Sequence, residues 1–288
     1  MGNEKLGFLV VGIFAIGLLF ANTITSQDWV NITGAPPEVS EPSCGSPIDL
    51  VANSSMVVYC TAVINDTNGF NDILAANLTF WDSGSSEGAA DSYLNHYQNS
   101  TCVLEGGSGT TVTANCSLTL WFNSNAGAWT AKIWAIDNTS LAASNESSVT
   151  INNLQAIAFV DAINFSSLAP GVISSAIAGA VTNLGNVVID INVSGTNLTS
   201  VDLGPDYQID VSKVKWAATS VAYDSMSALL TTDSWMDLSA AKSTDASGIP
   251  VAVSTDSYFM IQIPVGTEQY LPAGAYNGTI NVTATENV

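Results

Sequence analysis

In the segment 127–145, GAWTAKIWAIDNTSLAASN, the residue types alternate with a period of two up to the turn sequence Asp137-Asn138. A period of two puts successive side chains on opposite faces of a strand. One face of this strand is made by Trp129, Ala131, Ile133 and Ala135. We therefore expect these four residues to be buried and Trp134 to point the other way, which predicts a half-buried strand, a turn and a returning strand.

Similar short signals, separated by Gly, Asn and Ser turns, recur along the chain, and no convincing amphipathic helix interrupts them. The strands expected in the first half are 48–52, 56–64, 73–81, 92–97, 101–104, 111–122, 129–136 and 147–151. Those expected in the second half are 157–163, 174–181, 187–193, 211–216, 258–263 and 276–283. This spacing predicts an all-β chain with two antiparallel immunoglobulin-like or jelly-roll β-sandwiches, over 47–153 and 154–288. The less regular stretch 217–247 should hold a short helix or a long loop.

The chain opens with an apolar run, LGFLVVGIFAIGLLFA, over residues 6–21. This run fits the hydrophobic region of a secretory signal, and adding residues 22–24 brings it to the lower limit of a membrane span. We expect residues 1–26 to be a signal peptide or a signal-anchor helix, which would hold the protein in the membrane through residues 6–24 if it is not cleaved. Either outcome exports the chain from residue 27 onward, to an extracellular or cell-surface location.

Charged residues are scarce, at 10% of the chain against about 25% in an ordinary soluble protein. Five Lys and Arg face 25 Asp and Glu, which gives a formal net charge of -20. Nucleic-acid binding requires clustered Lys and Arg to neutralise phosphates, so this function is excluded. The hydrophobic share of 47% argues against a disordered chain. Something other than charge must therefore keep the surface soluble.

N-linked glycans attached at Asn-X-Ser/Thr sequons would keep the surface soluble in place of charge. Thirteen of the 25 Asn residues lie in this motif, whereas 60 Ser and Thr among 288 residues would place roughly five there by chance. The predicted glycosylation sites are Asn31, Asn53, Asn65, Asn77, Asn99, Asn138, Asn145, Asn164, Asn192, Asn197, Asn277 and Asn281. Asn115 is a poor acceptor because its sequon contains Cys116. The alternative is that Ser, Thr and Asn are simply favoured on exposed strands and in turns.

The four cysteines, Cys44, Cys60, Cys102 and Cys116, all lie in the first half of the chain. An even number in an exported chain predicts disulfides, for which three connectivities exist. A Gly-rich turn lies midway between Cys102 and Cys116, so this pair should face each other across a hairpin. Cys44 and Cys60 could bridge two earlier strands in the same way. A zinc site is not expected, because the chain has no CxxC motif and one histidine.

The segment NDTNGFND, residues 65–72, loosely resembles a calcium loop. It carries Asp66, Asn68 and Asp72 around a Gly turn between the second and third expected strands. Asp137 lies in a loop that the strand order places at the same end of the sandwich. These four oxygen donors predict calcium as a possible cofactor, and no other cofactor is expected. The alternative is a plain turn, for which Asn, Asp and Gly are also favoured.

No enzyme signature accompanies these residues, so we expect no catalytic function. A hydrolase needs a nucleophile with a base, or paired carboxylates in a cleft, and we assign no residues of this sequence to either arrangement. His96 is expected to be a solvent-facing strand or loop residue. The acidic loop with Asp82, Glu87 and Asp91 is expected to be solvated. Exposed Trp residues would favour stacking on sugars, although core packing is the expected role of most Trp residues here.

Two segments resemble parts of exported sandwich proteins. Residues 127–143 are similar to the last two strands of immunoglobulin-like modules in archaeal cell-surface proteins. Residues 166–198, SSLAPGVISSAIAGAVTNLGNVVIDINVSGTNL, resemble the opening strands of surface and filament sandwiches. Among the latter are TasA-like and bundling-pilus matrix proteins, whose subunits exchange a donor strand. The resemblance implies an extracellular structural subunit.

Together these features predict a glycosylated subunit of an extracellular filament, such as a pilus or thread, or of a surface coat. The expected partners are other copies of the chain, forming a homopolymer by β-strand addition. Residues 27–46, rich in Pro and polar residues, are expected to form an extended arm, with residues 27–39 as the donor and 276–283 as the second choice. The alternative is a membrane-anchored or secreted adhesin that binds cells or glycans. A pilin with a long N-terminal helix fits less well because the apolar run is short.

Overall fold

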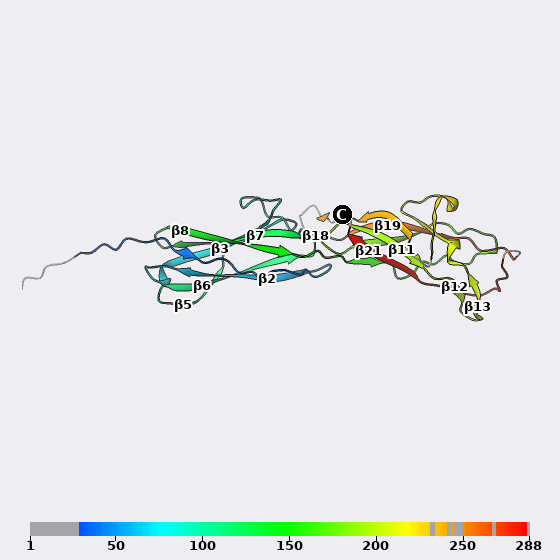
Figure 1. Cartoon of the computed structure of the whole chain (residues 1–288), viewed down its shortest axis with the longest axis horizontal. Coiled ribbons are helices and arrows are strands. Elements are labelled where there is room, and N and C mark those ends of the chain that lie inside the picture. The colour runs from blue at the N-terminus through cyan, green and yellow to red at the C-terminus, as the bar shows by residue number, and fades with distance from the viewer. Residues whose placement is uncertain (1–28, 231–233, 241–242, 245–249, 267–268, 287–288) are drawn as a thin grey trace, which may run out of the picture. The chain divides into compact units, whose positions relative to one another are not determined.

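A computed structural model describes residues 29–230, 234–240, 243–244, 250–266 and 269–286 (Figure 1). These residues form strands, turns and three short 3-10 segments, with no α-helix among them, which confirms the all-β prediction. The described part holds no helix long and apolar enough to cross a membrane. The predicted N-terminal helix and the apolar run at residues 6–24 lie outside the described residues. The described residues 29–34 belong to one unit and those from Ala35 onward to another.

The first sandwich consists of two four-stranded antiparallel sheets. Its strands are β1 (Glu38–Val39), β2 (Ser55–Asn65), β3 (Ile73–Asp82), β4 (His96–Asn99), β5 (Val103–Ser108), β6 (Thr111–Trp121), β7 (Gly127–Asp137) and β8 (Ala142–Ile151). One sheet has the order β1-β2-β6-β5 and the other the order β4-β3-β7-β8. Immunoglobulin sandwiches divide their strands in this way, with A-B-E-D facing the sheet that contains C, F and G. The strand order therefore favours the immunoglobulin-like of the two predicted arrangements.

The alternation in β7 builds the core of this sandwich. The buried side chains of β7 are Trp129, Ala131, Ile133 and Ala135, as the period of two predicts. Trp129 stacks on Phe80 of β3, with ring centroids 4.8 Å apart. From the opposite sheet, alternate residues of β2 and β6, such as Ile64 and Leu120, are also fully buried. Small Ala side chains between large ones let the two faces interdigitate.

Both disulfides lie within the β1-β2-β6-β5 sheet. Cys44 is bonded to Cys60 of β2, and Cys102, just before β5, is bonded to Cys116 of β6. These are the pairings that the local spacing indicated. Cys60 and Cys116 are register partners in the β2–β6 ladder. The four cysteines therefore form one buried row that ties both outer segments of the sheet to its central pair.

Some of the predicted elements differ in extent. Residues 48–52 form no strand; Ile48 makes one isolated bridge to Ile151. The predicted arm at 27–46 is also too long, because β1 pairs with β2 and Cys44 is bonded to Cys60. The pairing of β1 with β2 and the Cys44–Cys60 bond, which join residues 16 or more positions apart, hold these segments against the sheet.

The second sandwich is formed by strands that pair only with one another among the described residues. They are β9 (Ile157–Phe159), β10 (Ile177–Asn183), β11 (Ile189–Gly195), β12 (Leu198–Ser200), β13 (Gly204–Ile209), β14 (Val214–Ala217), β15 (Ser227–Ala228), β16 (Ser234–Ala240), β17 (Ser243–Thr244), β18 (Pro250–Val251), β19 (Val253–Ile261), β20 (Tyr276–Asn277) and β21 (Ile280–Glu286). A five-stranded sheet has the order β15-β14-β19-β10-β9, and β11 lies between β16 and β21 in another. Trp216 and Phe259 are central to its core.

Two corrections concern this half. The stretch 217–247 was expected to hold a short helix or a long loop; its described residues instead contain β15, β16, β17 and the 3-10 turn Tyr223–Ser225. Strands β12 and β13 occupy a region where the sequence indicated none. β12 has three residues, and β13 contains Gly204 and Pro205, which weaken a strand signal.

The turn between β10 and β11 holds the segment that joins the two sandwiches. Gly185 lies against Leu154, so close that an added Cβ would be 1.9 Å from the Leu154 carbonyl oxygen. Asn186 Oδ1 accepts a hydrogen bond from the Leu154 N–H (2.7 Å), and its Nδ2 donates to the Asn152 carbonyl (3.0 Å). The Asn-Leu-Gly-Asn turn is therefore a docking point for the segment 152–156.

Candidate functional site

Three aspartates converge where the chain passes from one sheet of the first sandwich to the other. Asp66 directly follows β2, Asp72 ends the 3-10 turn Phe70–Asp72 before β3, and Asp137 is the last residue of β7. Because β3 and β7 pair antiparallel, the start of β3 lies beside the end of β7, with Ile73 opposite Asp137. The strand order thus brings together residues more than 60 positions apart in the sequence.

One carboxylate oxygen from each aspartate lies within 4.8 Å of the others. Asp66 and Asp137 are 0% exposed, whereas Asp72 is half-buried. Asp66 Oδ1 accepts a hydrogen bond from the Asn68 N–H (2.7 Å), and Asp137 Oδ1 accepts from the Thr139 and Leu141 N–H groups (both 2.8 Å). The Oδ2 atoms of both buried aspartates have no hydrogen-bond partner among the described residues.

Hydrogen bonds favour the ionised form of Asp137. Burial by itself would raise the pKa of this carboxyl, because it penalises the charged form. The donors from Leu141 and Thr139 outweigh that effect and hold the pKa of Asp137 below its ordinary value. The site therefore contains an aspartate that is ionised at neutral pH although it is buried.

The side-chain oxygen of the fourth predicted ligand, Asn68, is hydrogen-bonded elsewhere. The Asn68 side chain is exposed, and its Oδ1 accepts a hydrogen bond from the Ala35 N–H (2.9 Å). The loop that carries it is held from two sides: Asp66 N–H donates to the Thr110 carbonyl (2.8 Å), and Asn138 N–H donates to the Asp72 carbonyl (2.8 Å). The sequence pattern located the loop, but only these contacts decide which of its oxygens turn inward.

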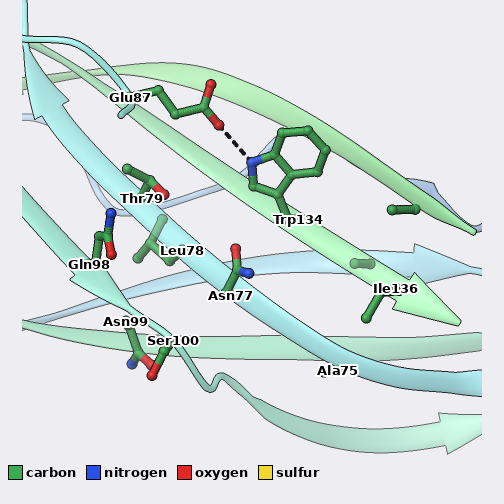
Figure 2. A pocket seen from close by; sticks show the side chains of 12 residues that line it. Ala75, Asn77, Leu78, Thr79, Glu87, Gln98, Asn99, Ser100, Trp134 and Ile136 are labelled. Carbon is green, nitrogen blue, oxygen red and sulfur yellow. Dashed lines mark hydrogen bonds between the residues drawn. The ribbon is translucent and has the colours of Figure 1, made fainter. Parts of the chain in front are cut away.

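A second feature is an open groove of about 460 Å³ on the outer face of the β4-β3-β7-β8 sheet. Figure 2 shows Trp134 of β7 beside Asn77 and Thr79 of β3, with Gln98 and Asn99 of β4 on the far side. Asn77 is the register partner of Trp134. The groove thus combines one aromatic ring with amide and hydroxyl groups on a shallow surface. Trp134 points out of the sandwich, as the alternation in the sequence predicts.

The loop between β3 and β4 fixes this tryptophan. Trp134 Nε1 donates to Glu87 Oε1 (2.8 Å), and Lys132 Nζ donates to Glu87 Oε2 (3.0 Å). Burial by itself would raise the pKa of Glu87, but the hydrogen bonds from Lys132 and Trp134 hold this pKa below its ordinary value. The expectation that Glu87 is merely solvated was therefore wrong. The sequence did contain a signal for this contact: Lys132 and Trp134 are two residues apart, so they lie on the same face of one strand and can bind the same carboxylate.

The expectation that His96 is solvent-facing was also wrong. His96 is fully buried; its Nδ1 lies 3.0 Å from Asp91 Oδ1, and its Nε2 lies 3.0 Å from the Glu87 carbonyl oxygen. Asp82 is likewise buried, and its Oδ1 accepts from the Gly84 N–H (2.9 Å). The acidic loop folds back onto the sheet, and both ring nitrogens of His96 are used to hold it.

The predicted glycosylation sites differ in accessibility. The exposed asparagines are Asn31, Asn53, Asn77, Asn138, Asn145, Asn164, Asn277 and Asn281, and the half-buried ones are Asn65, Asn99 and Asn197. Asn192 is 3% exposed, because β11 lies between β16 and β21. The folded chain does not present Asn192 to a glycosyltransferase, so this residue is removed from the predicted sites.

The two candidate donor segments also differ. Trp29, Val30 and Ile32 are 88%, 85% and 77% exposed, in a stretch without secondary structure. In contrast, the segment 276–283 is already paired within the chain: β20 pairs with β12, and β21 pairs with β11 from Ile280 to Glu286. The second-choice donor is therefore occupied in its own subunit.

No family model and no curated protein matches the chain. Among solved structures, one similar chain comes from the CsuC–CsuE chaperone–tip adhesion subunit pre-assembly complex of the Csu pili of Acinetobacter baumannii. It has 13% identity and a TM-score of 0.34, over 84% of this chain and 99% of that one. Another is the C-terminal domain of the AgI/II polypeptide BspA of Streptococcus agalactiae, with 10% identity and a TM-score of 0.24, over 88% of this chain and 96% of that one. Both of these proteins come from bacteria.

Proposed function

We propose that the chain is a non-catalytic structural subunit of an extracellular filament or coat, related to the TasA-like and bundling-pilus subunits that its sequence resembles. The observation that carries this proposal is the exposed apolar arm formed by Trp29, Val30 and Ile32. Large apolar side chains grouped on an extended segment favour a partner that covers them. Two buried disulfides in a chain with few charges support a role outside the cell.

The arm suits strand addition to a neighbouring copy. An extended donor adds hydrogen bonds to a sheet edge, and its alternate side chains enter the core beside that edge. Val30 and Ile32 have the two-residue spacing that this requires, and Pro36 and Pro37 limit the donor to the residues before them. The candidate acceptor is β21, which is the end strand of its sheet and carries Val282 against the second core.

Replacing Trp29, Val30 and Ile32 together by serine should abolish assembly and leave a folded monomer. Burial of these side chains is worth about 5 kcal/mol, so the association constant should fall by more than about a thousandfold. Sedimentation velocity and electron microscopy of the full chain measure this. The matched control replaces three exposed apolar residues elsewhere, Val51, Val201 and Leu203, by serine and should still assemble. Polymers that persist in the arm variant, or a wild type that stays monomeric at every concentration, would reject the proposal.

The groove beside Trp134 favours an adhesin as the second candidate function. Aromatic rings bind the apolar faces of sugars, while amides and hydroxyls satisfy the sugar hydroxyl groups. Asn77 and Asn99 line the same groove and are also predicted acceptors, so a glycan carried by the chain itself would compete for it. The proposal of N-linked glycans rests on the sequon excess and on the exposed sites, and mass spectrometry of the native protein tests it.

Trp134→Ala should weaken glycan binding by about tenfold or more, because a stacked aromatic ring is worth about 1 kcal/mol beyond its buried area. Binding is measured on a glycan array with full chain made in a host that does not glycosylate it. Tyr59→Ala removes an exposed aromatic residue from the other sheet and should leave binding unchanged. Absence of any glycan binding by the unglycosylated wild type would exclude the adhesin function.

A further inference from the structure

No ion pair among the described residues gives the three converging aspartates a compensating positive charge. Asp66 and Asp137 are fully buried, and the ion pairs among the described residues, His96–Asp91 and Lys132–Glu87, do not involve them. Burying carboxylates without a counter-charge is strongly unfavourable, and like charges placed together add to the penalty. Hydrogen bonds from backbone N–H groups satisfy one oxygen of each of these two buried carboxylates.

The second oxygens provide an independent observation. Asp66 Oδ2 and Asp137 Oδ2 are buried and have no hydrogen-bond partner within the part of the chain that the structure describes. Buried polar atoms of this kind are rare in folded proteins, and an ion is one of the usual reasons for them. In both residues the hydrogen bonds to Oδ1 orient the carboxylate, so its Oδ2 is held in position without being used. This is the state of a ligand that is preorganised for a cation.

We propose that Asp66, Asp72 and Asp137 bind a calcium ion at the end of the first sandwich. The donors are all oxygen, which suits a hard cation better than zinc or copper. Calcium lies about 2.3–2.6 Å from each ligand, so two ligands on opposite sides can be at most about 4.6–5.2 Å apart. The limit of 4.8 Å between the carboxylate oxygens falls in this range. Magnesium demands near-ideal octahedral geometry and gives up its waters reluctantly, so a site built from three protein carboxylates favours calcium.

The ion would join the two sheets of the sandwich, because Asp66 follows β2 of one sheet while Asp72 and Asp137 flank β3 and β7 of the other. It would also order Asn68, whose N–H binds Asp66 and whose side-chain oxygen binds the Ala35 N–H. Calcium would therefore restrict the motion of Ala35, the first residue of its unit. Three carboxylates on a surface module suit the weak affinities of extracellular calcium sites, with Kd about 10⁻⁴–10⁻³ M.

Isothermal titration of the purified full chain tests this inference. We expect one calcium ion to bind per chain, with magnesium at least about tenfold weaker. Asp66→Asn and Asp137→Asn should each lower calcium affinity by about tenfold or more, because each removes one ligand charge. Asp72→Asn should have the same effect. Because Asp72 is only half-buried, this variant is the one least prone to misfold. Glu105→Gln, an exposed acid on β5, is the charge-matched control and should bind as the wild type does.

Hydrogen exchange of the wild type gives a measurement without substitution. Calcium should slow exchange at the Asn68, Thr139 and Leu141 amides, which donate to the two buried aspartates, and should not slow exchange along β5. The inference is overturned if no saturable binding occurs up to about 10 mM calcium, well above the extracellular range. It is also overturned if all three Asp→Asn variants bind calcium as tightly as the Glu105→Gln control.

Discussion

Replacement of all four cysteines by alanine should lower the free energy of unfolding by about 6 kcal/mol, because a cross-link that closes a loop of about 15 residues is worth about 3 kcal/mol. The bonds Cys44–Cys60 and Cys102–Cys116 span sequence separations of 16 and 14. The expected loss is comparable with the whole stability of many domains, about 5–15 kcal/mol. We therefore expect the quadruple variant to be largely unfolded at room temperature, as measured by urea titration with tryptophan fluorescence.

Variants that lack one disulfide separate the two contributions, and each should lose about 3 kcal/mol. Alanine is used because a serine hydroxyl at these buried positions would lack a hydrogen-bond partner and add its own penalty. Cys60 and Cys116 are opposite each other in the β2–β6 ladder, so the two losses need not add. A quadruple variant that loses less than about 2 kcal/mol would show that the disulfides do not hold the sheet together.

Trp129→Ala should lower the free energy of unfolding by about 3–5 kcal/mol, the usual effect of removing a large core side chain. Trp129 is 1% exposed, stacks on Phe80 and lies 6.0 Å from the ring of Tyr97. Its Nε1 donates to the Asn125 carbonyl (2.8 Å), so the substitution also removes this hydrogen bond. Urea unfolding measures the change as a lower midpoint with an unchanged slope.

Trp134→Ala is the matched control, because it removes the same side chain from the opposite face of β7. Trp134 is half-buried and holds Glu87 and the loop above it, so its loss should be smaller, about 1–2 kcal/mol. Equal losses for the two variants would contradict the assignment of Trp129 to the core and Trp134 to the outer face.

Most of the first sandwich could be predicted because its long strands carry a strong two-residue period. β2, β3, β6 and β7 are 10 or 11 residues long, and each was located to within two residues. The short elements were harder to locate. β4, with four residues, and the three-residue β9 and β12 are held by neighbouring strands rather than by their own patterns. A strand of three or four residues contains too few alternations to be distinguished from a loop.

Part of the candidate cation site could also be predicted. Asp66 and Asp72 lie in a turn between two clear strands, and Asp137 ends a third, so the strand order placed them at one end of the sandwich. The inward or outward direction of each side chain could not be predicted in loops. Asn68 turns toward Ala35, and His96 is buried by a loop that folds back over the sheet. These directions depend on hydrogen bonds outside any periodic pattern.

The sequence by itself determined the all-β class and the buried face of β7, and it indicated the local disulfide pairings, because each follows from spacing along a single segment or hairpin. Only the tertiary structure decided that Glu87 holds Trp134, that Asn192 is inaccessible, and that two buried aspartates share a site with unpartnered oxygens. Those features need contacts between segments 47 or more residues apart, or burial between neighbouring strands. Alternation along one strand shows which face is buried, whereas the pairing of distant strands decides which side chains meet.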